Sequence, residues 1–325
     1  MKVSVIGSGA YGIALSSMLY ENNIDIIIWT KFEEECRLLN EKHCHTTKLP
    51  SYSIPTDIQI TTDIDLALKD TDLILIAVPA AFMDNVSRTL SQHISGKEHF
   101  CIASKGIEND SCMFVTDVFN RHIKTNKLAV ISGGSFAIDI VQKVPIGLSL
   151  ATNNSETEQI VKQALQNRYL KLRPTDDIIG IEICGSIKNV IAIASGMISG
   201  MNLPESTKAM FITESLHDIK GLIDALGGDK KTILSFAGFG DLLLTCTSEK
   251  SRNFKLGYLI GQKRDQEIIN NYMNTTTIEG LYTLKSIYKL LNDKKVDMPI
   301  IDLIYDIIYK DTKVEALTSF LMDKK

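Results

Sequence analysis

The chain has 325 residues, which is enough for two domains of ordinary size. Hydrophobic residues make up 44% and charged residues 23%, proportions typical of a globular protein. The formal net charge of −4 argues against a nonspecific nucleic-acid-binding protein, which needs a basic face, although a local basic pocket for a small anion stays open.

The first thirty residues alternate between strand and helix patterns. The run "KVSVIG" at 2–7 predicts a buried strand, and 10–22 has the spacing of an amphipathic helix. The run "IDIIIWT" at 24–30 predicts a second buried strand. A glycine motif in the turn after the first strand therefore has the setting that gives such a motif a mechanism.

That turn contains "VIGSGAYGIALS", in which Gly7, Gly9 and Gly12 spell GxGxxG. Gly7 permits the tight turn, Gly9 lets the backbone approach a pyrophosphate, and Gly12 allows the helix to pack closely on the strand. The free N–H groups at the helix N-terminus then face the phosphates. The motif predicts a dinucleotide site; a glycine turn with a packing role alone is the alternative.

The end of the second predicted strand bears on the choice between NAD and NADP. An acid there binds the ribose 2′-hydroxyl and repels a 2′-phosphate. The strand ends "IIWTKF", with no acid at its tip, and Glu33 comes slightly later. Lys31 can pair with a 2′-phosphate and Thr30 can donate a hydrogen bond, so NADPH is favoured over NADH. A solvated surface lysine is the alternative interpretation.

Further apolar strands alternate with helical patterns through the first half of the chain. Such alternation predicts a parallel sheet covered on both faces, here a Rossmann-like doubly wound sheet. We place this dinucleotide-binding domain at residues 1–176. The remaining strands are expected at 71–79, 99–106, 128–134, 145–153 and 169–177.

The pattern changes to long helical periodicity from Ile178 onward. Residues 177–325 are therefore expected to form an all-helical C-terminal domain, which makes the fold class α/β followed by a helical substrate-binding and catalytic domain. Residues 235–253, "SFAGFGDLLLTCTSEKSRN", interrupt the helices with glycines and polar residues. This segment is a candidate functional loop.

Polar and small residues follow two of the predicted strands. Ligands of a doubly wound sheet bind beyond the carboxyl ends of its strands. Lys105 follows one apolar strand within "ASKG", and "VISGGSFA" supplies Gly133, Ser135 and Ala137 after another. Lys105 is a candidate for substrate binding; a surface lysine is the alternative.

Lys188 and Asn189 lie inside a strongly apolar helical segment, "GSIKNVIAIASGM". A lysine in such surroundings is unfavourable unless it is paired or functional. Asp241, which follows glycines in the candidate loop, is a suitable partner. A lysine that snorkels at the edge of the helix is the alternative.

The same loop offers donors for a phosphate group. An arginine with hydroxyl and amide neighbours suits a phosphate, because its guanidinium forms charge-assisted hydrogen bonds. A hydrogen-bonded structural loop is the alternative. The candidate donors are Thr245, Ser251, Arg252 and Asn253.

The cysteines and the N-terminus bear on location. Six scattered cysteines without a CxxC pair fit reduced thiols in the cytosol. Met1 leads almost directly into a strand, and apolar stretches are interrupted before about 18 residues, so neither a signal peptide nor a transmembrane helix is expected. The segment "KHCHTTK" is a weak metal candidate, and we expect no metal site.

Seven stretches together resemble the successive motifs of bacterial-type NAD(P)-dependent sn-glycerol-3-phosphate dehydrogenase. They follow the family's order and span nearly the whole chain; the most specific are "SIKNVIAIASG" and "GDLLLTCTSEKSRN". The resemblance implies interconversion of dihydroxyacetone phosphate and sn-glycerol 3-phosphate, which supplies glycerophospholipid synthesis. The stretches are "GSGAYGIAL", "ASKGIE", "ISGGSFA", "EICGSIKNVIAIASGM", "GFGDLLLTCTSEKSRN", "IEG" and "DMPI".

The resemblance also implies roles for individual residues. Lys188 matches the catalytic acid/base lysine, with Lys105 and Asp241 as its partners around the substrate. Ser251, Arg252 and Asn253 match the loop for the substrate phosphate, and Gly133 and Ser135 match a turn that helps to enclose the substrate. Positions that match cofactor contacts are Ala10, Tyr11, Lys31, Lys105, Ala137, Arg252, Thr277 and Glu279.

Three positions depart from the family pattern. Gly134 stands where the family usually has proline, Thr277 where it has valine, and Glu214 where it commonly has arginine. These changes affect the expected turn, the helix contacts and the rim of the substrate pocket rather than the chemistry.

Two other functions stay open at this point. A related β-hydroxyacid or 6-phosphogluconate-type dehydrogenase would share the two-domain plan, and a non-catalytic NAD(P)-binding redox sensor would bind cofactor without turnover. The expected partners are a small phosphate-bearing substrate and NADP or NAD, without nucleic acid or stable membrane insertion. A homodimer stays open.

Overall fold

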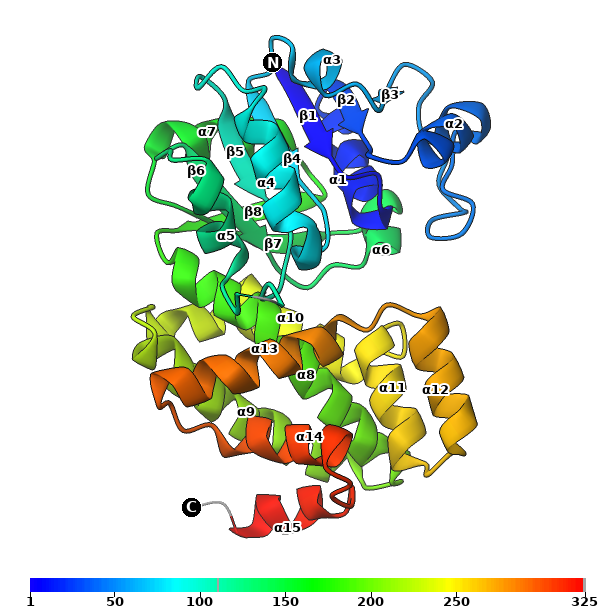
Figure 1. Cartoon of the computed structure of the whole chain (residues 1–325), viewed down its shortest axis with the longest axis vertical. Coiled ribbons are helices and arrows are strands. Elements are labelled where there is room, and N and C mark those ends of the chain that lie inside the picture. Colours follow the sequence, from blue (N-terminus) through cyan, green and yellow to red (C-terminus); the bar gives the residue numbers. More distant parts are fainter. Residues whose placement is uncertain (110, 324–325) are drawn as a thin grey trace. The chain divides into compact units, whose positions relative to one another are not determined.

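The computed structural model describes residues 1–109 and 111–323 and divides into two compact units (Figure 1). The first unit comprises Met1–Lys105 and Val115–Ile178, and the second comprises Gly106–Phe114 and Ile179–Lys325. The short segment Gly106–Phe114 thus groups with the second unit although the first surrounds it in the sequence. Each unit has its own hydrophobic core.

The first unit is built on an eight-stranded sheet with the order β3-β2-β1-β4-β5-β6-β7-β8. Its first six strands have the order of a dinucleotide-binding doubly wound sheet, so the predicted Rossmann-like architecture is confirmed. The strands are β1 (Lys2–Ile6), β2 (Asp25–Trp29), β3 (Gln59–Thr61), β4 (Leu73–Ile76), β5 (His99–Ile102), β6 (Leu128–Ser132), β7 (Ile146–Thr152) and β8 (Leu170–Thr175).

One strand pair departs from the predicted parallel arrangement. β7 runs antiparallel to β6, with Val130 opposite Ala151, whereas the other neighbouring pairs of the described sheet are parallel. The connection contains only the five-residue helix α6 (Ala137–Val141), which advances about 8 Å along its axis. That rise is only about half the length of β6, so the connection does not return the chain to the start of β6. The chain therefore enters β7 near the end at which β6 stops and runs in the opposite direction. The short strand β3 was also missing from the sequence prediction.

Helices cover both faces of this sheet. Apolar residues of α1 (Ala10–Glu21), α6 and α7 (Ser155–Leu165) join one core cluster with Val5 of β1 and Cys101 of β5. Phe100 points to the opposite face and meets Phe119 of α5, with ring centroids 5.1 Å apart. Together with α6, the described helices of this unit are α1 (Ala10–Glu21), α2 (Glu33–Lys42), α3 (Ile64–Leu68), η1 (Ala80–Phe82), α4 (Met83–Ser91), α5 (Val115–His122) and α7 (Ser155–Leu165).

The second unit is helical and is organised around α8 (Ile178–Gly200), as the sequence predicts. Of the described helices, α8 is the one long and apolar enough to cross a membrane, but 83% of its apolar window is buried inside the protein, as expected of a core helix. The other helices are α9 (Glu205–Ala225), η2 (Lys230–Leu234), η3 (Phe236–Gly240), α10 (Asp241–Thr247), α11 (Arg252–Gly261), α12 (Gln266–Thr275), α13 (Glu279–Lys294), α14 (Pro299–Tyr309) and α15 (Ala316–Asp323).

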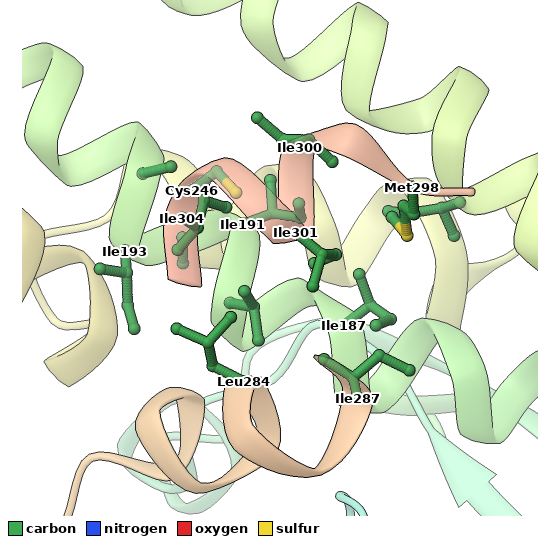
Figure 2. Packing of buried hydrophobic residues seen from close by; sticks show 14 of the residues in the cluster. Ile187, Ile191, Ile193, Cys246, Leu284, Ile287, Met298, Ile300, Ile301 and Ile304 are labelled. Atoms are coloured by element: carbon green, nitrogen blue, oxygen red, sulfur yellow. The ribbon is translucent and has the colours of Figure 1, made fainter. Parts of the chain in front are cut away.

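Aliphatic side chains of α8, α13 and α14 form the centre of this unit (Figure 2). Ile187 and Ile191 of α8 lie among Leu284 and Ile287 of α13 and Ile301 of α14, and all five are fully buried. Because α8 is apolar around its whole circumference, it can be enclosed by neighbouring helices on every side. A polar side chain on this enclosed helix therefore needs a hydrogen-bond or ion-pair partner.

Helices α8 and α11 pack backbone to backbone through four glycines, which we call the glycine seam: Gly196 and Gly200 of α8, and Gly257 and Gly261 of α11. A Cβ atom at Gly257 would lie 1.8 Å from the carbonyl oxygen of Ile193, and one at Gly196 would lie 2.0 Å from that of Phe254. In each helix the two glycines are four residues apart and share one face. The seam therefore leaves no room for a side chain.

We predict that Gly257→Ala lowers the free energy of unfolding by about 3 kcal/mol, because the new methyl group must push two helix backbones apart. Gly221→Ala in α9 is the matched control, since no described heavy atom lies within 4 Å of a Cβ there. The control should gain about 0.5–1 kcal/mol from helix propensity. Urea unfolding followed by far-UV circular dichroism measures both, and equal midpoints for the two variants would contradict the close approach.

Candidate active site

The predicted glycine motif forms a tight turn between β1 and the N-terminus of α1. Gly7 has φ +116°, a conformation that favours glycine, and a Cβ on Gly12 would lie 2.1 Å from the Gly7 carbonyl oxygen. Gly9, the residue before α1, has no described heavy atom within 4 Å of its Cβ position. The turn is closed by Gly7 and Gly12 and open at Gly9, which suits the approach of a pyrophosphate to the helix N-terminus.

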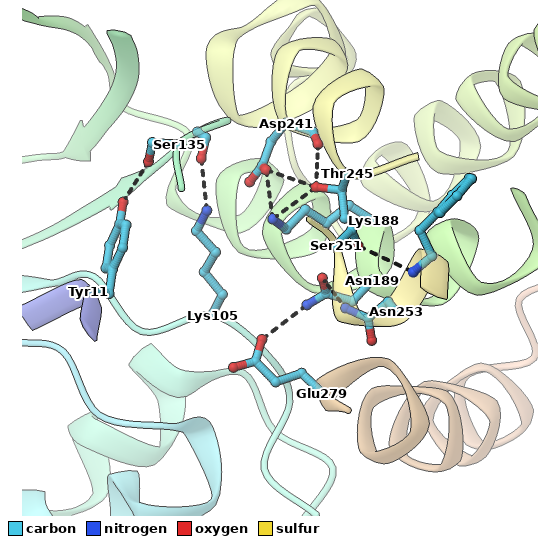
Figure 3. Close-up of polar contacts among 12 residues, drawn as sticks. Tyr11, Lys105, Ser135, Lys188, Asn189, Asp241, Thr245, Ser251, Asn253 and Glu279 are labelled. Atoms are coloured by element: carbon cyan, nitrogen blue, oxygen red, sulfur yellow. Dashed lines mark hydrogen bonds and ion pairs between the residues drawn. The ribbon is translucent and has the colours of Figure 1, made fainter. Parts of the chain in front are cut away.

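A second group of polar residues follows β5 and β6 in the same unit (Figure 3). The Lys105 ammonium donates a hydrogen bond to the Gly133 carbonyl oxygen at 2.9 Å, and its nitrogen lies 6.0 Å from the centre of the Tyr11 ring. The Tyr11 hydroxyl lies 3.1 Å from the Ser135 hydroxyl. A Cβ at Gly133 would lie 2.7 Å from the Gly147 carbonyl oxygen, so the turn needs glycine there. These contacts link the glycine turn, Lys105 and the turn after β6.

The end of β2 carries both a cation and an acid. Lys31 is exposed, and its ammonium lies 3.5 Å from Asn85 Oδ1. Glu35, from the first turn of α2, accepts hydrogen bonds from the Ser8 and Thr30 hydroxyls. The sequence interpretation missed this carboxylate, because Glu35 is five residues beyond Thr30 and only the start of α2 brings it back. The signal available in the sequence was the acidic run at the helix start.

In the second unit, Lys188 forms a buried ion pair with Asp241 (Figure 3). The Lys188 ammonium lies 2.6 Å from Asp241 Oδ1 and 3.3 Å from the Thr245 hydroxyl oxygen. The Lys188 side chain is 12% exposed and that of Asp241 is 1% exposed. Asp241 begins α10 and Thr245 lies one turn later, so both face Lys188 from one helix. The pair satisfies two charges that burial would otherwise penalise.

The next residue of α8, Asn189, belongs to a buried amide network. Asn253 donates from Nδ2 to Asn189 Oδ1 at 2.9 Å, and its own Oδ1 accepts from the Gly280 N–H at 2.8 Å. Asn189 donates in turn to Glu279 Oε2 at 3.3 Å. The network joins α8, the start of α11 and the start of α13. Gly280, which sequence reasoning did not single out, serves through its backbone N–H.

The remaining residues of the predicted phosphate loop start α11. The Ser251 hydroxyl accepts from the Phe254 N–H and caps the helix. Arg252 is the first helical residue, and its side chain is 53% exposed, with its guanidinium 4.0 Å from Glu279. The exposed guanidinium next to a helix N-terminus forms a positive site that a phosphate can reach.

The structure divides the sequence-predicted site residues between the two units. The first unit contains Gly7, Gly9, Ala10, Tyr11, Gly12, Lys31, Lys105, Gly133, Ser135 and Ala137. The second unit contains Lys188, Asn189, Asp241, Thr245, Ser251, Arg252, Asn253, Thr277 and Glu279. Of the positions that depart from the family pattern, Gly134 and Glu214 are half-buried and Thr277 is exposed.

Comparison with known proteins identifies two matching families. The family described as NAD-dependent glycerol-3-phosphate dehydrogenase N-terminus matches residues 2–158, and the corresponding C-terminus family matches residues 177–319. Glycerol-3-phosphate dehydrogenase [NAD(P)+] of Staphylococcus saprophyticus is 35% identical over 99% of this chain and 98% of that protein.

Solved structures give the same comparison in three dimensions. A glycerol-3-phosphate dehydrogenase from Coxiella burnetii matches with a TM-score of 0.93 at 27% identity and covers 99% of each chain. One from Saccharomyces cerevisiae matches with a TM-score of 0.87 at 22% identity, also over 99% of each chain, which shows a common fold.

We predict that Lys188→Met lowers the free energy of unfolding by about 3 kcal/mol, because it leaves the Asp241 carboxylate buried and uncompensated. The double variant Lys188→Met/Asp241→Asn removes both charges and should regain most of that loss. A double-mutant cycle in urea measures the coupling. Additive effects of the two substitutions would show that the pair is not coupled.

Proposed function

The chain belongs to the NAD-dependent glycerol-3-phosphate dehydrogenase family, and from that premise we propose which residues carry out its reaction. It is an NAD(P)-dependent oxidoreductase that interconverts dihydroxyacetone phosphate and sn-glycerol 3-phosphate. The buried pair of Lys188 with Asp241 is the observation that carries the assignment of roles.

The first unit fits the dinucleotide. Gly9 leaves its backbone open where a Cβ would stand, and the N–H groups of Ala10 and Tyr11 begin α1. We assign pyrophosphate binding to this turn and further cofactor contacts to Lys31, Lys105 and Ala137. When bound, the reduced nicotinamide supplies a hydride to the carbonyl carbon of the substrate.

We propose that Lys188 is the general acid and base. Its ammonium gives a proton to the oxygen that becomes the alkoxide as the carbon gains the hydride, which yields the secondary alcohol. In the reverse direction the Lys188 amine takes that proton back. Asp241 and the Thr245 hydroxyl hold the ammonium at 2.6 Å and 3.3 Å and fix its direction.

Substrate phosphate recognition is assigned to the start of α11. Arg252 supplies an exposed guanidinium, and the first N–H groups of the helix supply further donors. Ser251 and Asn253 also belong to this proposed site, and their hydrogen bonds shape it: Ser251 caps α11, and Asn253 connects it to Asn189 and Gly280.

The remaining expected contacts are proposals of the same kind. Lys105, held by the Gly133 carbonyl oxygen, adds a positive charge for the anionic substrate, and Ser135 lies on the same turn. Arg252, Thr277 and Glu279 are assigned further cofactor contacts. When the phosphate is bound, it holds the substrate with its carbonyl group positioned for reaction. Binding energy at the non-reacting phosphate end of the substrate therefore supports turnover.

Cofactor preference, location and partners complete the proposal. Lys31, exposed at the end of β2, favours NADPH over NADH. A cytosolic location is supported by six cysteines, none of which forms a disulfide in the part of the chain that the structure describes. We further propose a role in supplying glycerophospholipid synthesis, no partner among nucleic acids, no stable membrane insertion, a homodimeric state, and domains of residues 1–176 and 177–325.

We predict that Lys188→Ala lowers kcat for dihydroxyacetone phosphate at least about a thousandfold, because the alkoxide loses both its proton donor and its positive field. NADH binding, followed by fluorescence, should stay within about twofold. Lys220→Ala, an exposed lysine on α9, is the matched control. Near-normal turnover of Lys188→Ala would refute the assignment.

We predict that Arg252→Ala lowers kcat/KM for dihydroxyacetone phosphate about 10- to 100-fold at saturating cofactor, because charge-assisted hydrogen bonds to the phosphate are lost. The rate of reduction of unphosphorylated dihydroxyacetone, measured beside it, should change little. Arg264→Ala, another exposed arginine of this unit, controls for the change in charge. Equal losses on both ketones would place Arg252 outside phosphate recognition.

A further inference from the structure

The Glu35 carboxylate joins the glycine turn to the end of β2. Its Oε1 accepts hydrogen bonds from the hydroxyl of Ser8, which lies between Gly7 and Gly9, and from that of Thr30, at 3.3 Å. Ser8 and Thr30 are each 3% exposed, whereas the Glu35 side chain is 26% exposed. The carboxylate is therefore held by two buried hydroxyl groups and is still partly accessible to solvent.

The other carboxylate oxygen faces two basic side chains. Glu35 Oε2 lies 3.7 Å from His45 Nε2 and 3.7 Å from the Lys48 ammonium. His45 Nδ1 accepts from the Lys48 N–H, so Nε2 carries the proton of the neutral ring, and that buried nitrogen has no hydrogen-bond partner among the described residues. Burial and the nearby Lys48 lower the pKa of His45, which favours the neutral imidazole. Glu35 Oε2 therefore faces a neutral imidazole rather than a cationic histidine.

This position is where a doubly wound sheet binds the adenosine ribose. β1 and β2 are neighbours, with Ile6 opposite Trp29, so the glycine turn and Thr30 follow adjacent strand ends (Figure 1). An acid at that point accepts a hydrogen bond from the ribose 2′-hydroxyl. A 2′-phosphate would instead bring a second negative group close to the carboxylate. Exposed Lys31 follows Thr30 directly and attracts that same phosphate.

We propose that Glu35 is a cofactor-specificity residue that opposes Lys31: the carboxylate accepts the ribose 2′-hydroxyl of NADH and disfavours the 2′-phosphate of NADPH. The inference rests on the proposed function and refines its cofactor site. Two opposite charges at one strand end leave only modest discrimination between the cofactors. The chain then uses both, and Glu35 limits the preference that Lys31 creates.

The experiment compares kcat/KM for NADPH with kcat/KM for NADH at saturating dihydroxyacetone phosphate. Glu35→Gln should raise the NADPH/NADH ratio about tenfold, mainly through KM, and Lys31→Gln should lower it by a similar factor. Glu33→Gln is the matched control, because it removes the same charge from the same exposed helix start, two residues away. Its ratio should stay within about twofold of the wild type.

A binding measurement tests the same point without turnover. Calorimetric titration of the whole chain with 2′,5′-ADP and with 5′-AMP reports the adenosine end alone, and Glu35→Gln should favour 2′,5′-ADP about tenfold. Thermal unfolding checks that each variant is folded; Glu35→Ala removes the same charge and replaces Glu35→Gln if the latter does not fold.

Several results would overturn the inference. An unchanged NADPH/NADH ratio of kcat/KM in a folded Glu35→Gln protein would show that Glu35 does not discriminate between the two riboses. An equal shift of that ratio in Glu33→Gln would show the same. If the wild-type chain oxidised neither cofactor with dihydroxyacetone phosphate, the proposed function would fail, and the titrations would still decide the role of Glu35.

Discussion

The backbone contact between α8 and α11 is the constraint on which the chemistry of the second unit depends. Gly196 and Gly257 remove the side chains that would hold the two helices apart. Only at that close distance can Asn253, at the start of α11, bond the side chain of Asn189 on α8. Asn189 follows Lys188 directly, so the seam and the amide network also fix the part of α8 that carries Lys188.

A charged residue in an apolar helix needs compensation, and the chain provides it from a distant segment. Asp241 is 53 residues from Lys188 and reaches it because α10 begins at that residue. Gly238 makes this start possible, since its non-helical backbone (φ −82°, ψ −107°) breaks the preceding turn, and a Cβ there would lie 2.3 Å from the Ile233 carbonyl oxygen. The result is an ammonium whose direction is set by two partners on one helix, as proton transfer requires.

The two units contribute different kinds of recognition. The first uses backbone geometry and glycines, which serve any dinucleotide, and so its fold alone does not choose a reaction. In our proposal, the second uses specific side chains for a proton and a phosphate, and these select the substrate. Within the first unit, we assign selectivity to the end of β2, where Lys31 and Glu35 have side chains of opposite charge type beside the proposed ribose position.

Local pattern determined much of this protein. Apolar runs located seven of the eight strands, because burial on both faces imposes continuous hydrophobic sequence. The three-residue β3 was missed because three residues are too few to show a period. The glycine motif predicted a dinucleotide turn, and Lys188 in an apolar segment gave a candidate for proton transfer. The order of the family motifs predicted the family and its reaction, which the comparisons confirm.

Tertiary structure decided which groups the buried side chains contact and in which direction the strands run. Periodicity reports that a residue is buried but not which group it meets. The internal bonds of Asn253 to Asn189 and Gly280, the antiparallel β7, and the return of Glu35 to Ser8 and Thr30 could not be predicted from local sequence. Each depends on the path of the chain between the interacting groups, which only the packing of whole helices and strands determines.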